Sequence, residues 1–336
     1  MTPRERVKAA FQFREPDALP YTIWYDEGVA RRVAEYYGDP TWPNRFTNHI
    51  LRLTVEWEQK TPTQSDRYLD EHGTEWESGN IMRIVRPALS SASLRGYSLP
   101  DYTRNLEKVL PPVRAQFEAA PNIFRVVGFG FGVFERAWMM RGFENFFMDV
   151  VEHPAFVEEL LDAILDRQLA LIDQLAQLPV DGIIFSDDFG DQRGVIVGPE
   201  RWRRFIKPRI AALYQRAHER GKWTLQHTCG NVFDIVPDLI EAGLDCLQCL
   251  QPEAMNVYEI KRRYGDRLRL WGGVGTQQLL PRGTPQQIRA EVLRLARELG
   301  RGGGYVLTSA KPIRDDVPTG NAVAFLEAIL ELHKHR

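Results

Sequence analysis

The chain has 336 residues, and its 43 basic and 45 acidic side chains leave a formal net charge of −2. Apolar residues make up 43% of it, and 8 Trp, 11 Tyr and 17 Phe exclude a disordered chain, because so many aromatic side chains collapse into a core. The near-neutral charge argues against a nucleic-acid-binding protein, which would carry a basic excess. No apolar run approaches the roughly 18 residues needed to cross a bilayer, so we expect no membrane partner.

Three cysteines are too few for a disulfide framework. The first residues lack the apolar core of a signal peptide and predict instead a helix capped by Thr2, with Pro3 as its first residue and Glu5 as the reciprocal cap. We therefore expect a cytoplasmic location, where free cysteines serve as core residues, metal ligands or nucleophiles.

Strand and helix patterns alternate along the chain. The first predicted strand is 19–24, and the segment 66–87 is predicted to form a hairpin insertion. Helical patterns separate further strands, which are predicted at 122–128, 181–187, 222–227, 244–249, 268–272 and 305–308. This alternation, without a linker between two halves, predicts parallel strands that are covered by helices.

The predicted strands are too many for one half of a Rossmann fold, and its glycine fingerprint is absent after the first strand. We therefore predict an α/β fold in which residues 1–336 form a single (β/α)8 TIM barrel, an architecture of about 250 residues. The surplus is assigned to an N-terminal extension with a hairpin or helical insertion over about residues 1–120. Regular barrel units then occupy about residues 121–336.

The carboxyl ends of the strands form the active-site mouth of such a barrel, and polar side chains follow the predicted strands at these ends. The predicted catalytic residues are Asp187, Asp188 and His227. The predicted substrate-binding residues are Trp24, Asp26, Glu135, Arg136, Gln192, Gln251, Trp271 and Lys311. We expect Asp26, Asp187, His227, Cys229, Gln251 and Lys311 to line the mouth.

His227 and Cys229 close one strand two residues apart, so both can point at one metal ion, and imidazole with thiolate suits zinc. Cys249 closes the next strand and is the predicted third ligand. Cys246, three residues earlier, is predicted to pack in the core. The alternative is a buried cysteine beside a hydrogen-bonded histidine, without a metal.

Two further patterns leave alternatives open. One of Asp187 and Asp188 is expected to aim into the mouth and the other away from it, and either could instead cap backbone amides. The basic stretch 201–209 is predicted to be a solvated or a subunit-contacting face rather than a phosphate-binding site, and Trp202 and Phe205 are its candidate contact residues.

Several motifs along nearly the whole chain resemble the uroporphyrinogen decarboxylase superfamily. They are Arg4–Ala10, Asp187–Gly194, Lys207–Arg209, His227–Asn231, Pro237–Asp245 and Asp316–Pro318. The resemblance implies a (β/α)8 barrel that is usually cytoplasmic and often dimeric. It also implies one of two activities, decarboxylation in the tetrapyrrole pathway or methyl transfer by a zinc enzyme that works with a corrinoid protein.

The motifs favour the methyltransferase branch. The decarboxylases carry an arginine-rich R-Q-A-G-R motif at the first strand, where this chain has the acidic Trp24–Gly28. His227 and Cys229 match the first two zinc ligands of the methyltransferases. Their third ligand is a cysteine after the last strand, where this chain has Lys311, whose positive charge disfavours a cation. Either Cys249 or a carboxylate then completes the site, or the protein binds no zinc.

The resemblance therefore implies a methyltransferase that moves a methyl group between a small-molecule donor or acceptor and a corrinoid protein, and that forms a homodimer. One alternative is a decarboxylase of an acidic substrate, for which Arg136, Arg193 and Lys311 are the basic candidates. Another is a non-catalytic barrel that binds a corrinoid or a tetrapyrrole.

Overall fold

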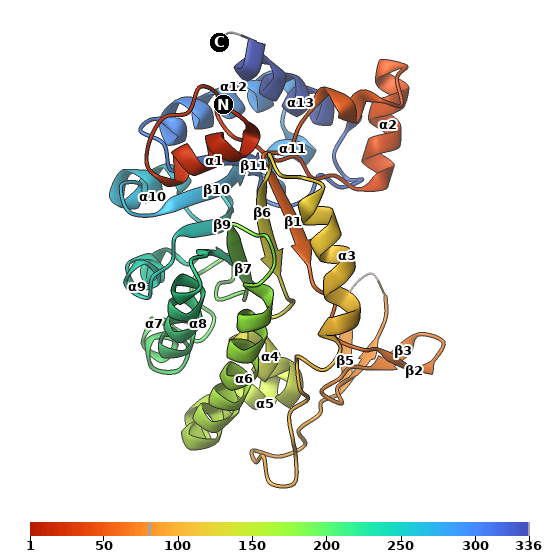
Figure 1. Ribbon diagram of the computed structural model, residues 1–336, viewed down its shortest axis with the longest axis vertical. Coiled ribbons are helices and arrows are strands. Elements are labelled where there is room, and N and C mark those ends of the chain that lie inside the picture. The colour runs from red at the N-terminus through yellow and green to blue at the C-terminus, as the bar shows by residue number, and fades with distance from the viewer. Residues whose placement is uncertain (80–81, 335–336) are drawn as a thin grey trace.

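A parallel sheet forms the centre of the computed structural model, which describes residues 1–79 and 82–334. The sheet is seven-stranded with the order β1-β6-β7-β8-β9-β10-β11. Its strands are β1 (Ile50–Thr54), β6 (Phe124–Gly128), β7 (Gly182–Ser186), β8 (Trp223–His227), β9 (Cys246–Leu250), β10 (Arg269–Val274) and β11 (Tyr305–Ser309). Figure 1 shows this sheet curled, with helices around it. The predicted α/β fold with parallel strands is confirmed.

Helices surround the sheet, most of them on its outer side (Figure 1). They are α1 (Pro3–Phe11), α2 (Glu27–Tyr37), α3 (Leu106–Glu118), α4 (Val133–Arg141), α5 (Phe143–Glu152), α6 (Pro154–Leu175), α7 (Pro199–Arg201), α8 (Lys207–Glu219), α9 (Val236–Glu241), α10 (Val257–Tyr264), α11 (Leu279–Arg282), α12 (Pro285–Gly300) and α13 (Thr319–Lys334). The predicted capping box of α1 is present, because the Thr2 hydroxyl accepts the Glu5 amide and the Glu5 carboxylate accepts the Thr2 amide. Among the described residues, no helix combines the length and the apolar character that a membrane crossing requires.

The predicted strand at 19–24 is not a regular strand. Tyr21 forms an isolated parallel bridge with Leu307 of β11, and on its other side its carbonyl oxygen accepts the amide of His49 at 2.9 Å, just before β1. At Ile23 a side chain replaces the backbone acceptor of a regular strand pair, because the Ile23 amide donates to Asn48 Oδ1 at 2.7 Å. The segment thus lies between the two edge strands of the sheet and is bonded to both.

The predicted hairpin insertion is larger than expected. It is a four-stranded antiparallel sheet in the order β2 (Thr61–Gln64), β3 (Arg67–Leu69), β4 (Glu75–Glu77) and β5 (Arg83–Arg86). In Figure 1 it projects from the lower right of the molecule. A buried ion pair between Asp70 and Arg136, at 3.5 Å, ties it to α4.

Trp202 and Phe205 do not mark a contact face, and that prediction is wrong. Both are buried, with 0% and 3% of their surface exposed. The helical turn Trp202–Ile206 directs them into the core, where the Trp202 ring packs edge-on against Phe189 at 5.5 Å.

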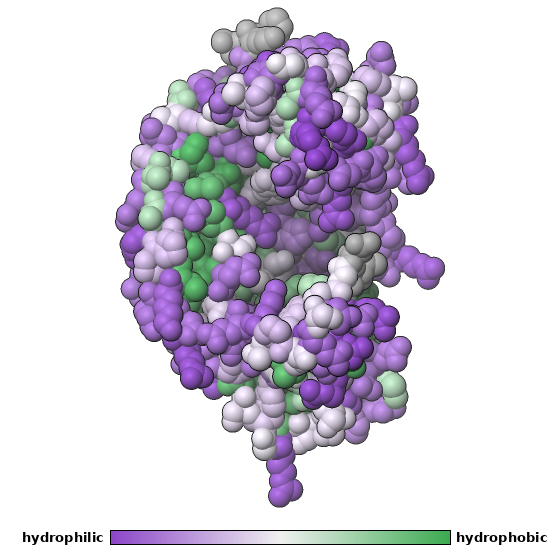
Figure 2. All heavy atoms as spheres, turned by 90° about the vertical axis from the view of Figure 1, so that its right-hand side faces the viewer, coloured by the Kyte–Doolittle hydropathy of each residue, from purple (hydrophilic) through white to green (hydrophobic). Residues whose placement is uncertain are grey.

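The core has two layers on the two sides of the sheet. The larger layer lies between the strands and the outer helices, and the smaller layer fills the inside of the curled sheet with Ile50, Phe124, Ile184, Leu225 and Val306. Successive side chains on a strand point to opposite faces, so this inner set identifies which residues face inward. One face of the molecule is hollowed between the α2 region and the insertion (Figure 2).

Candidate active site

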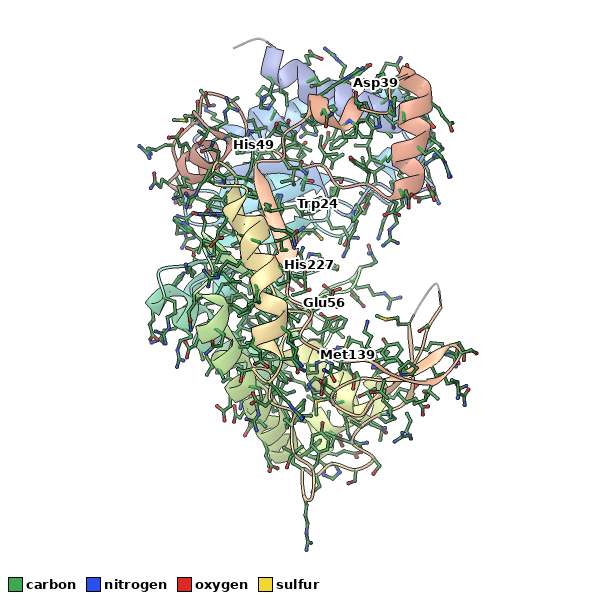
Figure 3. The ribbon with its side chains drawn as sticks, turned by 45° about the vertical axis from the view of Figure 1, so that its right-hand side comes forward. Trp24, Asp39, His49, Glu56, Met139 and His227 are labelled. Carbon is green, nitrogen blue, oxygen red and sulfur yellow. The ribbon has the colours of Figure 1, made fainter. Side chains whose placement is uncertain are left out.

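The carboxyl ends of neighbouring parallel strands bring the predicted site residues together. Ser186 of β7 is in register with His227 of β8, and His227 is in register with Gln248 of β9. Figure 3 shows His227 between Trp24 and Glu56, at the level of the hollow that separates the upper helices from the insertion. His227 therefore lies at the hollowed face.

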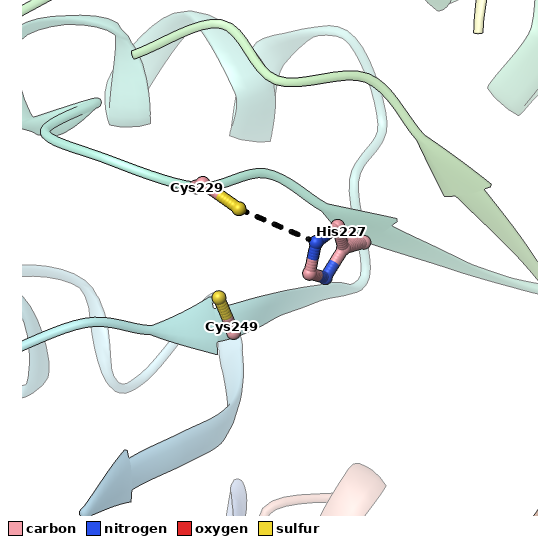
Figure 4. Close-up of side chains that lie close together, drawn as sticks. All are labelled: His227, Cys229 and Cys249. Carbon is pink, nitrogen blue, oxygen red and sulfur yellow. Dashed lines mark hydrogen bonds between the residues drawn. The ribbon is translucent and has the colours of Figure 1, made fainter. Parts of the chain in front are cut away.

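The centre of the site is a group of one histidine and two cysteines (Figure 4). The ligand atoms of His227, Cys229 and Cys249 all lie within 4.8 Å of one another. Cys229 Sγ is 3.5 Å from His227 Nε2. Cys246 is fully buried in the inner apolar layer, as predicted. The structure thus assembles the three predicted metal ligands and leaves Cys246 out.

Hydrogen bonds orient the imidazole of His227. Its Nδ1 lies 2.5 Å from Gln248 Oε1, and a side-chain amide oxygen can only accept, so Nδ1 carries the proton. Nε2 then has a free lone pair, which accepts from the Nζ of Lys311 at 3.1 Å. The ring therefore directs Nε2 at the two thiols. An imidazole that binds a metal needs this arrangement.

The two thiols are not equivalent. The neighbouring Cys229 thiol and the positive charge of Lys311 lower the pKa of Cys249, although its burial acts in the opposite direction. The proximity of Cys249 and burial raise the pKa of Cys229. Cys249 is therefore the more readily ionised of the two sulfurs.

The donor set fits a zinc ion. One imidazole and two thiols within 4.8 Å supply three ligands, which leaves a fourth position for a substrate atom. Gln248 provides the outer hydrogen bond that fixes the ring. Lys311 opposes a cation, because its ammonium group lies beside the same nitrogen that would bind the metal. His227 Nε2 is available to zinc only when the Lys311 ammonium moves away.

The acidic pair after β7 divides into two roles. Asp187 is 1% exposed, and its carboxylate accepts the backbone amides of Phe134 and Glu135 at 2.9 and 2.7 Å, in the first turn of α4. The prediction that Asp187 lines the mouth is therefore wrong, because its carboxylate caps a helix N-terminus. Asp188 is partly exposed, accepts the Cys229 amide at 2.8 Å and lies 3.8 Å from His227 Nε2. Of the two acids, Asp188 is the one at the histidine–cysteine group.

Glu135, in the first turn of α4, keeps a proton at neutral pH. Burial, followed by the negative charges of Asp187 and Asp188, raises its pKa to about 9. Burial also raises the pKa of Asp187 to about 7, although its two amide donors act in the opposite direction. Glu135 is thus a buried carboxylic acid next to the acids of the site.

We expect the free energy of unfolding to fall as the pH rises toward 9, because Glu135 keeps a proton in the folded chain that it loses in the unfolded chain. In the unfolded chain this carboxyl ionises near 4.5, whereas in the folded chain it ionises at about 9. Between these two pKa values the folded chain binds one proton more than the unfolded chain. The stabilisation from this proton is therefore complete below pH 4.5 and is lost as the pH rises to about 9. In urea unfolding at pH 5.5, 7 and 9, the free energy of unfolding should decrease less with rising pH for Glu135→Gln than for the unmutated chain. Parallel curves for the two chains would contradict the assignment.

A cavity of 530 Å³ adjoins the histidine–cysteine group. Cys229, Gln192, Gln251 and Lys311 line it, and the Gln251 side-chain oxygen also accepts the Gly230 amide at 3.1 Å. The structure therefore places both glutamines and Lys311 of the predicted substrate-binding set next to the group. A separate cavity of 620 Å³ between α11 and α12 is lined by none of the predicted site residues.

The other predicted substrate-binding residues lie farther from the sulfur atoms. Trp24 and the exposed Asp26 line a cavity of 430 Å³ at the rim. Arg136 lines a cavity of 180 Å³ and is already paired with Glu58 and Asp70. Trp271 is fully buried in the inner apolar layer, and its indole N–H donates to Thr22 Oγ1 at 3.0 Å.

Two residues of the site were not predicted. Arg52 projects inward from β1, a strand that was not among those predicted, although the apolar and β-branched run 50–55 and the acidic residues after it would have marked a strand end. Gln248 orients His227, and a lone polar residue in an otherwise apolar strand was the available signal.

Comparisons with known proteins agree with the fold. Residues 73–332 match the family model described as uroporphyrinogen decarboxylase (URO-D). The uroporphyrinogen decarboxylase of Psychromonas ingrahamii is 25% identical over 269 residues, which is 77% of this chain and 74% of that protein. The corresponding enzyme of Aliivibrio salmonicida is 24% identical over 274 residues, or 78% and 74% of the two chains. The solved structure of a methyltransferase from Methanosarcina mazei has a TM-score of 0.73 at 21% identity and covers 99% of both chains.

Proposed function

The chain belongs to the uroporphyrinogen decarboxylase family, and on that premise we propose that it is a methyltransferase that moves a methyl group between a small molecule and a corrinoid protein. The observation that carries the proposal is the group of His227, Cys229 and Cys249, whose ligand atoms lie within 4.8 Å of one another at the mouth. A thiol pair beside an imidazole suits chemistry at zinc or sulfur. The likeness in fold to a methyltransferase over 99% of both chains supports the same activity.

The residues of this chain have distinct parts in the proposal. His227, Cys229 and Cys249 would hold zinc, which supplies a Lewis acid that keeps an acceptor thiol ionised or polarises the atom that loses its methyl group. Gln248 holds the imidazole in the required tautomer. Asp188, the partly exposed acid beside His227, accepts or returns the proton of the small molecule.

The proposal also contains the predictions that follow from the family resemblance. The whole chain, 1–336, acts as one (β/α)8 barrel in which the segment at 20–25 takes the eighth strand position. The enzyme works in the cytoplasm as a homodimer. The corrinoid is carried by a separate protein, which meets the hollowed face (Figure 2), because His227 lies at the level of that hollow (Figure 3).

A methyl-transfer assay with a purified corrinoid protein tests the proposal. Transfer to or from cobalt changes the visible absorption of the corrinoid, so the reaction is followed directly in the presence of methylated donors with oxygen, nitrogen or sulfur at the methyl group. We expect a change with at least one donor class, together with about one zinc ion per chain if zinc takes part. An unchanged cobalt spectrum with every class would contradict the proposal.

A second candidate function is decarboxylation of an acidic substrate. The observation that favours it is the pair of cationic residues at the site, Arg52 and Lys311, neither of which forms an ion pair with a carboxylate among the described residues. Both could bind substrate carboxylates. Release of carbon dioxide from a porphyrinogen or a smaller acid, without any change at cobalt, would select this function.

A further inference from the structure

Arg52 is a cation inside the curled sheet. Ile50, two residues earlier on β1, belongs to the inner apolar layer, and side chains two apart share a face. Leu51 and Leu53 pack instead against the outer layer of the core. Arg52 is paired in register with Val126, another inner residue. Its guanidinium therefore points into the interior, above the apolar floor.

Nothing in the described part of the chain neutralises this guanidinium. Among those residues Arg52 makes no side-chain hydrogen bond and no ion pair, whereas Arg125 on the neighbouring strand lies 3.9 Å from Asp181. Burial lowers the pKa of Arg52, and the nearby Cys249 acts in the opposite direction. Its side chain nevertheless stays partly exposed, so a solute can reach it. A desolvated guanidinium with five N–H donors and no acceptor is costly unless a ligand pairs with it.

A second polar group in the interior also lacks a partner. Thr308 is fully buried, and its Oγ1 makes no hydrogen bond with the described residues. It stands two residues after Val306, which belongs to the inner layer, so Thr308 faces the same interior. Trp24 and Trp271, whose rings are 5.2 Å apart, supply apolar surface there. The interior thus offers a cation, a hydroxyl and aromatic walls.

We propose that Arg52 binds a carboxylate of the small-molecule substrate and so selects an anionic methyl donor or acceptor. The planar fork of the guanidinium matches a carboxylate with two parallel hydrogen bonds, which a neutral group cannot form. Lys311, beside His227, adds a second positive charge on the side of the sulfur atoms. The carboxylate end lies toward Arg52, and the methylated end lies toward the histidine–cysteine group.

The identity of the ligand as a methylated compound rests on the proposed function, but the anion site is tested by binding alone. Isothermal titration calorimetry of the full chain with methoxyacetate, 2-methoxyethanesulfonate and the neutral 2-methoxyethanol compares a carboxylate, a sulfonate and an uncharged analogue. We expect methoxyacetate to bind most tightly and Arg52→Gln to weaken it roughly 10- to 100-fold. The binding of 2-methoxyethanol should not change.

Two further variants test whether the geometry of the Arg52 guanidinium, and not the loss of any positive charge, determines binding. Arg52→Lys keeps the charge but loses the fork, so it should recover only part of the affinity for methoxyacetate. Arg301→Gln removes an exposed arginine from the turn before β11 and should bind like the unmutated chain. Equal methoxyacetate affinity in Arg52→Gln, or no binding to the unmutated chain, would overturn the inference. Binding that depends on Arg52 without any methyl transfer would support the anion site and refute only the proposed function.

Discussion

Replacement of Cys249 by alanine is expected to remove bound zinc and to slow methyl transfer by roughly 100-fold or more. Cys249 is the sulfur whose pKa is lowered by the Cys229 thiol and by Lys311, and it is the one that reaches the group from β9. Without it only two protein ligands remain, which is too few for a stable zinc site. Zinc per chain and the initial rate of change in the cobalt spectrum measure the two effects.

The other two cysteines supply the controls for this result. Cys229→Ala should behave like Cys249→Ala, because both atoms belong to the same group. Cys246→Ala should keep its zinc and its rate, since Cys246 is fully buried among apolar residues and contributes only packing. Equal zinc content in all three variants would refute the site.

The second large effect concerns stability. Asp187→Ala is expected to lower the free energy of unfolding by about 2–4 kcal/mol, because it leaves two buried amides of α4 without an acceptor. Those amides belong to Phe134 and Glu135, and the carboxylate between them is 1% exposed, so water cannot replace it readily. Asp187→Asn retains one acceptor oxygen, so its free energy of unfolding should fall less than that of Asp187→Ala. Urea unfolding followed by circular dichroism measures both variants.

Asp191→Ala is the matched control for Asp187→Ala. Its carboxylate also accepts two backbone amides, those of Arg193 and Gly194 at 2.7 and 3.0 Å, but it lies on an exposed turn. Water satisfies these amides after the substitution, so the loss of stability should be much smaller. An equal loss of unfolding free energy in Asp187→Ala and Asp191→Ala would show that the burial of the amides at Asp187 does not increase its contribution to stability.

Local patterns in the sequence determined much of the fold. Apolar runs of strand length, separated by helical periodicity, predicted β6 to β11 and their parallel order, because each run buries both faces of its strand. The spacing of His227 and Cys229 predicted that the two side chains meet, since residues two apart at a strand end share a face. Cys249 followed from the same argument on the adjacent strand.

The tertiary structure decided what depends on partners distant in the chain. Asp187 and Asp188 are neighbours of the same type, and only the position of α4 makes one a buried cap and the other an accessible acid. The run 50–55 could have marked β1 as a strand, but the lack of a partner for Arg52 is a property of the whole interior and could not be predicted from it. Composition and periodicity thus determined the sheet and the histidine–cysteine group, whereas burial and long-range hydrogen bonds decided the protonation and role of each charged residue around it.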